Sequence, residues 1–143
     1  TMKQIQPSEA LEHGLELFRA SPFHKYYSVE DIYTYLQLPI KHGKLRLYYD
    51  NGKPVGIITW CWLTTEDADA FLQGSYHPTE DDYQHDAPDT KELWGMEFIA
   101  PYGHTRQMIR AIKHSIQQIH GPQKVNWRRT HSRDKRRAKR FHT

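Results

Sequence analysis

A single glutamate stands in an apolar run late in the chain. Glu97 is flanked by Met96 and Phe98, and the run ends at Pro101-Tyr102-Gly103. A buried carboxylate is costly unless it is paired or hydrated, and such surroundings can shift its pKa enough for proton transfer. Glu97 is therefore a candidate catalytic group. The alternative is a structural ion pair or a hydrogen bond to a neighbouring tyrosine.

A histidine occupies a tight turn near the start of the chain. His24 ends the sequence Ser21-Pro22-Phe23-His24 between two predicted helices. A turn can direct a side chain into a cleft, and an imidazole can act as base, acid or acyl acceptor near neutral pH. The alternative is an exposed loop histidine, because the chain has ten histidines. The others form no His-Glu-x-x-His motif or compact ligand set, so we expect no metal site.

The Tyr102-Gly103 turn leads directly into a predicted helix. Backbone amides at a helix N-terminus can hold a phosphate or an oxyanion, and the alternative is a simple connecting turn. Cys61 is the one cysteine, which excludes an internal disulfide. Its place in mid-strand indicates packing rather than nucleophilic chemistry.

The composition indicates one soluble domain over residues 1–143. The chain is 37% hydrophobic and 26% charged, and its mean hydropathy is −0.87. We expect no membrane-spanning helix and no signal peptide, because no long apolar run is present. With one cysteine, we expect a reducing cytoplasm.

The net charge of +3 is unevenly distributed. Residues 124–143 contain nine Lys/Arg and one acid, a balance of +8, while residues 1–123 carry −5. Such a basic tail attracts polyanions: phosphate groups, nucleic acid or an acidic protein. Arg128 and Arg129 could clamp phosphates or stack on bases, and the alternative is a solvated terminus.

Hydrophobic periodicity predicts an α+β fold with a central, mostly antiparallel sheet flanked by helices. Ser8 is the expected cap of the first helix, Ser28-Val29-Glu30-Asp31 has the form of a capping box, and Asn51-Gly52 predicts a hairpin turn. Residues 75–90 are acidic and predict an exposed loop. The expected helices cover 7–20, 28 to Pro39, 64–73 and 105–120, and the expected strands cover 44–49, 54–63, 91–100 and about 125–127.

Three segments together resemble the toxin-activating lysine acyltransferases of bacterial RTX toxin operons. They are Ser21-Pro22-Phe23-His24, Pro54-Val55-Gly56 leading to Trp60, and Met96-Glu97-Phe98-Ile99-Ala100-Pro101-Tyr102-Gly103. The similarity extends from about Leu15 to Ile119, in the family's order and near its spacing.

The resemblance implies a fatty acyl transfer from acyl carrier protein to internal lysine ε-amino groups of an inactive protoxin or similar acceptor. It implies a fold like that of the GNAT N-acetyltransferases, with no permanently bound cofactor. The acyl-phosphopantetheine of the carrier protein is the co-substrate. The family's essential histidine falls on His24 beside a matching Ser21. Its catalytic aspartate falls on Glu97, a departure by one methylene, and a family asparagine is replaced by Tyr35.

In this interpretation, His24 deprotonates the acceptor lysine or accepts the acyl group, and Glu97 orients the imidazole or stabilises its cation. Amides near Tyr102 and Gly103 would bind the oxyanion or the phosphate of the donor. Arg128 and Arg129 would dock the acidic carrier protein. The sequence also permits a homodimer. The alternatives are a nucleic-acid-binding protein that uses the basic tail, which leaves Glu97 without a purpose, and a catalytically inactive relative that acts as an adaptor.

Overall fold

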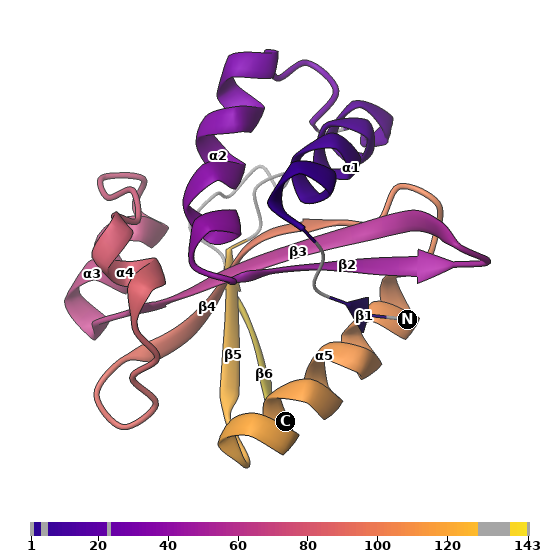
Figure 1. The fold of residues 1–143 in the computed structure, drawn as a ribbon. Coiled ribbons are helices and arrows are strands. Elements are labelled where there is room, and N and C mark those ends of the chain that lie inside the picture. Colours follow the sequence, from indigo (N-terminus) through magenta and orange to yellow (C-terminus); the bar gives the residue numbers. More distant parts are fainter. Residues whose placement is uncertain (1, 4–5, 23, 129–137, 143) are drawn as a thin grey trace. The chain divides into compact units, whose positions relative to one another are not determined.

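The computed structural model describes residues 2–3, 6–22, 24–128 and 138–142. Within these ranges, the strands follow the order β1-β2-β3-β4-β5-β6 in an open sheet (Figure 1). The β1–β2, β2–β3 and β5–β6 pairs are antiparallel, and the β4–β5 pair is parallel. This confirms the predicted mix of helices with a mostly antiparallel sheet. The strands are β1 Met2–Lys3, β2 Leu45–Asp50, β3 Lys53–Leu63, β4 Glu92–Ile99, β5 Lys124–Arg128 and β6 Ala138–His142.

The helices differ in length and in how they begin. They are α1 Pro7–Ala20, α2 Val29–Lys41, α3 Thr65–Leu72, α4 Glu80–Gln84 and α5 Thr105–His120. The chain divides into two compact units, which we describe separately. The first comprises Thr1–Thr59 and Glu97–Ile112, and the second comprises Trp60–Met96 and Lys113–Thr143. The single domain over 1–143 stays a prediction.

In the first unit, the caps of α1 and α2 are set by local sequence. Ser28 accepts a hydrogen bond from the Asp31 amide, and the Asp31 carboxylate accepts one from the Ser28 amide, so the predicted capping box is confirmed. The prediction that Ser8 caps α1 is wrong: the N-cap is Gln6, and Pro7 takes the first helical position, where a missing N–H costs nothing.

Pro39 does not end α2 as predicted, because the helix continues to Lys41. A proline removes one backbone hydrogen bond, and near a helix end that loss is confined to the last turns. The Pro39 ring is buried, and its carbonyl accepts a hydrogen bond from the Lys44 amide after the helix. Packing therefore outweighs the breaking tendency of proline at this position.

The β2–β3 hairpin turns where the sequence predicts. Asn51 and Gly52 have positive φ angles of 51° and 78°. Two positive φ angles match the backbone twist that a tight antiparallel hairpin requires. The pairing next to the turn, Tyr49 opposite Pro54, shifts by one residue at an irregularity between Tyr48 and Tyr49. Beyond it, Leu45 lies opposite Thr59 and Leu47 opposite Ile57.

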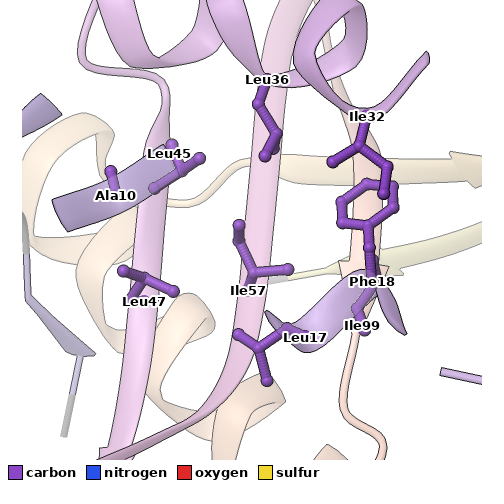
Figure 2. Packing of buried hydrophobic residues seen from close by; sticks show 9 residues of the cluster. All are labelled: Ala10, Leu17, Phe18, Ile32, Leu36, Leu45, Leu47, Ile57 and Ile99. Carbon is purple, nitrogen blue, oxygen red and sulfur yellow. The ribbon is translucent and has the colours of Figure 1, made fainter. Parts of the chain in front are cut away.

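The core of the first unit lies between α1, α2 and one face of the strands (Figure 2). Because side chains alternate along a strand, Leu45 and Leu47 of β2 point to the same face as Ile57 of β3 and Ile99 of β4. These residues meet Leu17 and Phe18 of α1 and Ile32 and Leu36 of α2, shown together in Figure 2. The same alternation puts Thr59 and Glu97 on this helix-covered face, two residues from Ile57 and Ile99.

The second unit has its own apolar cluster, built around Trp62, Leu93 and Val125, with Trp60, Ile116 and Trp127 packed against it. Residues 80–84 were expected in a loop but form α4, which begins with a capping box between Thr79 and Asp82. The buried Asp82 carboxylate also accepts a hydrogen bond of 2.5 Å from the Tyr76 hydroxyl. These local polar contacts order a segment whose composition indicates a loop.

The backbone approach of β4 to β5 depends on a glycine. Gly95 lies opposite Trp127, and a Cβ atom at Gly95 would lie 2.0–2.3 Å from three ring carbons of Trp127. An aromatic ring cannot bend out of the way, so a methyl group requires the whole side chain to move.

We therefore expect Gly95→Ala to lower the free energy of unfolding by about 1–3 kcal/mol, the usual cost of overpacking. Urea denaturation measures the change. In a Trp127→Ala background the same substitution should cost little, because the clashing ring is absent. An equal loss in both backgrounds would contradict the steric explanation.

Cys61 is fully buried in β3, and burial raises the pKa of its thiol well above the usual value, with the nearby Asp82 carboxylate adding to the effect. A raised pKa means less thiolate at any given pH, and the thiolate is the reactive form. This agrees with the expected packing role.

Native protein at pH 8 should accordingly react with a thiol reagent such as DTNB far more slowly than protein unfolded in guanidinium chloride. The single cysteine makes absorbance a direct count of reacted protein. Reaction at the same rate in both states would show that the thiol is accessible and activated.

Candidate active site

The turn after α1 is shaped by Pro22. The residue before a proline is disfavoured in helical geometry, and Ser21 accordingly has extended angles of −79° and 126° and ends α1. The amides of His24 and Lys25 then donate to the Ser21 carbonyl at 3.2 and 2.9 Å. This closed turn brings the His24 ring back onto the Ser21 side chain.

The His24 imidazole is held through both ring nitrogens. Nδ1 lies 2.7 Å from the Ser21 hydroxyl oxygen, and Nε2 lies 3.5 Å from a carboxylate oxygen of Glu97. The residue is 6% exposed, so the alternative of an exposed loop histidine is wrong. Two residues 73 positions apart in the chain are therefore brought together on the helix-covered face of the first unit.

Aromatic rings fix the plane of this imidazole. The Phe18 ring centroid is 5.3 Å from that of His24 at an interplanar angle of 75°, and the Tyr27 centroid is 5.4 Å away at 65°. Both are edge-to-face arrangements, which favour one ring orientation over others. His24 is thus restrained by Ser21, Phe18 and Tyr27 before any substrate is present.

Glu97 is positioned through its backbone as well as its side chain. Its amide donates a hydrogen bond to the Thr59 hydroxyl at 3.0 Å, and its side chain is 14% exposed. The carboxylate is therefore partly shielded from water and faces a protonatable ring. The contact with His24 corresponds to the structural alternative of an ion pair.

Thr59 and Tyr27 belong to this site but were not identified from the sequence. Thr59 is a fully buried polar residue in a strand that is apolar on both faces, and that contrast was a usable signal. Tyr27 follows His24 by three residues in an irregular segment, where no periodicity indicates the direction of a side chain.

Tyr102 and Gly103 lie in the exposed turn between β4 and α5. The Gly103 amide donates to the Ala100 carbonyl at 3.4 Å, and its φ of 90° is one that glycine adopts without strain. His104 follows, and its Nε2 lies 3.1 Å from a carboxylate oxygen of Asp50 in the hairpin turn. The contacts described for the first unit join neither Tyr102 nor Gly103 to His24, so their role in donor binding stays a prediction.

Arg128 belongs to the second unit, where its guanidinium is engaged. It lies 4.0 Å from the centroid of the Phe71 ring and donates a hydrogen bond of 2.7 Å to the Phe71 carbonyl. Arg129, the other arginine predicted to dock the donor, lies outside the described residues. The nucleic-acid alternative gains no support from an arginine held in this way.

Two further properties concern residues 2–3, 6–22, 24–128 and 138–142. Within these ranges, no cluster of three or more histidine, cysteine or acidic side chains is arranged to hold a metal ion. Nor does any of the described helices combine the length and apolar character needed to cross a bilayer.

Comparison with known proteins identifies the family. Residues 3–142 match the RTX toxin acyltransferase family. The chain is 25% identical over 115 residues to the leukotoxin-activating lysine-acyltransferase LtxC of Aggregatibacter actinomycetemcomitans, a match that covers 80% of this chain and 66% of LtxC. It is also 25% identical over 120 residues to the lysine-acyltransferase RtxC of Vibrio cholerae, covering 81% of this chain and 72% of RtxC. A match over nearly the whole length, with the expected histidine and acidic residue in contact, establishes that this chain belongs to the RTX toxin acyltransferase family.

Proposed function

We propose that this protein transfers a fatty acyl group from acyl carrier protein to lysine ε-amino groups of an RTX protoxin or a similar acceptor. The observation that carries the proposal is the His24–Glu97 contact of 3.5 Å, with Ser21 on the opposite ring nitrogen. The names of LtxC and RtxC describe lysine acyltransferases, and that of LtxC adds leukotoxin activation. The chain aligns with 66% of LtxC, so donor and acceptor are part of the proposal.

The acceptor lysine must lose a proton before it attacks a thioester, because its usual pKa is about 10.4. The contact of 2.7 Å between Nδ1 and the Ser21 hydroxyl allows a tautomer in which Nδ1–H donates to Ser21. In that tautomer, the Nε2 lone pair of His24 can take the proton. Glu97 then faces an imidazolium and stabilises its charge, as a carboxylate does in a catalytic triad. The ammonium group can enter beside both partners and donate to Nε2 and to the carboxylate.

The amine nitrogen attacks the thioester carbonyl, the C–S bond breaks, and the proton released on amide formation goes to the departing thiol. The products are an amide and the free phosphopantetheine thiol, so the reaction needs no oxidant, metal or permanent cofactor. The first proton, which His24 took from the ammonium group before the attack, is released from the imidazolium to solvent. In the alternative mechanism, His24 accepts the acyl group from the thioester and the same thiol leaves in this first step. The lysine amine then attacks the acyl-histidine.

Donor binding is assigned to the turn between β4 and α5. The first N–H groups of α5 lack helical acceptors, so the region of Tyr102 and Gly103 suits the phosphate of a pantetheine arm or the oxyanion. Arg129 and its basic neighbours would attract the acidic carrier protein, which is met in the bacterial cytoplasm. A mostly antiparallel sheet with helices against it is compatible with a GNAT-like fold, which we include in the proposal.

We expect His24→Ala and His24→Gln to reduce acyl transfer by about 10²- to 10⁴-fold, since general base catalysis contributes that much. Glu97→Gln, which removes the charge but keeps the shape, should reduce it by about 10²-fold or more. Intact mass of a protoxin fragment, incubated with carrier protein loaded with a series of acyl chains, measures transfer. His114→Ala, at an exposed position on α5, is the control. Full activity in a folded His24→Gln variant would remove the proposed role.

Thr59 is expected to act as a positioning residue for Glu97. Thr59→Val keeps the shape but removes the oxygen that accepts the Glu97 amide, whereas Thr59→Ser retains it. We expect kcat to fall roughly tenfold in Thr59→Val, equivalent to about 1.4 kcal/mol, with the acceptor KM nearly unchanged. Thr59→Ser should stay close to the wild type. Equal kcat values for the two variants would mean that Thr59 only fills space.

A further inference from the structure

His24 and Glu97 are nearly enclosed, so an acceptor side chain needs a path to reach them. Their side chains are 8% and 14% exposed. Of the other described groups in contact with the imidazole, Phe18 is fully buried and Ser21 is 5% exposed. Neither leads to the surface. Tyr27 is the remaining neighbour, and it is partly exposed.

From Tyr27 the aromatic contacts continue outward. The Tyr27 and Tyr35 ring centroids are 5.6 Å apart at an interplanar angle of 38°, and Tyr35 is 43% exposed. Within the part of the first unit that the structure describes, His24, Tyr27 and Tyr35 thus form a series of touching rings. The series begins at the buried imidazole and ends at solvent on α2.

The chemistry of this series suits a lysine side chain. The faces of tyrosine rings attract an ammonium group, and the methylenes of lysine pack against them. Asp31 lies one helical turn before Tyr35 and adds negative charge nearby. The same segment already holds one such contact, because Lys25 Nζ lies 5.1 Å from the centroid of the Tyr26 ring.

We propose that Tyr27 and Tyr35 form the entrance for the acceptor lysine, and that Tyr35 binds its ammonium group over the ring face before the amine reaches His24. This inference rests on the proposed function and assigns the acceptor side of the same site. The occupant is a cationic lysine side chain presented by the acceptor protein. An acyl chain in this place is the alternative that the experiment must detect.

The kinetic test uses Tyr35→Phe, Tyr35→Leu and Tyr35→Ser with a lysine-bearing protoxin fragment and a fixed acyl carrier protein donor. Phe keeps the ring face, Leu keeps only apolar bulk, and Ser keeps neither. We expect the acceptor KM to rise about threefold to thirtyfold in the Leu and Ser variants, the range of a cation–ring contact. Tyr35→Phe should stay within about twofold of the wild type, and kcat and the donor KM should not change.

Tyr33→Leu is the matched control, because Tyr33 lies on the same helix and is 47% exposed. It should leave all constants unchanged. Three results would overturn the proposal: wild-type acceptor KM in Tyr35→Leu, a rise in the donor KM that grows with acyl chain length, or equal effects at Tyr33 and Tyr35. The second of these results would assign the rings to the acyl chain.

A binding measurement separates this inference from the proposed function. Nuclear magnetic resonance titration with Nα-acetyl-lysine methylamide and with its Nε-acetylated form needs no acyl donor. The wild type should bind the cationic probe more tightly than the neutral one, and Tyr35→Leu should lose that preference. Equal binding of the two probes by the wild type would contradict the proposed entrance at Tyr27 and Tyr35. If the wild type prefers the cationic probe but transfers no acyl group, only the proposed function is contradicted.

Discussion

A carboxylate on the helix-covered face of a sheet needs a partner, and here the partner is an imidazole. Without His24, the Glu97 carboxylate would lose the protonatable partner that the described residues give it. A shielded carboxylate without such a partner costs several kcal/mol. Without Glu97, the imidazole would lose the carboxylate beside Nε2 and keep the Ser21 contact on Nδ1 and the ring contacts with Phe18 and Tyr27. The position of the α1–α2 turn over the strands is therefore tied to the residue at position 97.

The contact between His24 and Glu97 depends on two features of the backbone outside the two side chains. Pro22 ends α1 and forces the turn that presents His24, while strand alternation places Glu97 on the same face as Ile99. The core residues in Figure 2 hold the helices against that face. The apolar packing supplies the stability, and the polar pair uses the geometry that the packing provides.

Much of this arrangement could be predicted from the sequence, because it depends on local rules. Three of its features are properties of short segments. They are the Ser28 capping box, the Asn51-Gly52 turn and the position of Glu97 on the same strand face as Ile99. The exceptions depend on tertiary contacts. Pro39 stays inside α2 since its ring is buried, and residues 80–84 form a helix around the buried Asp82.

The candidate site, too, could be predicted only in part from local sequence. The family resemblance and the apolar setting of Glu97 indicated that His24 and Glu97 lie together, but residue types could not show which groups surround them. Thr59 reaches Glu97 across 38 positions of sequence, and Tyr27 turns its ring toward His24 within an irregular segment. The strand β6 lies in the tail that was expected to be a charged terminus, and it forms by pairing with β5. Pairing of this kind depends on a partner strand and leaves no mark on composition.

The resemblance implies an aspartate where this chain has Glu97, and the difference follows a similar logic. Glutamate has one more rotatable bond, so holding its carboxylate in one place costs more side-chain entropy. The backbone of Glu97 is fixed by Thr59, and the far end of the side chain is placed by His24. Anchoring at both ends limits the freedom that the extra methylene introduces. An aspartate at position 97 would end one methylene short of the place that the Glu97 carboxylate takes beside His24, so the same contact would need the turn to lie closer to the sheet.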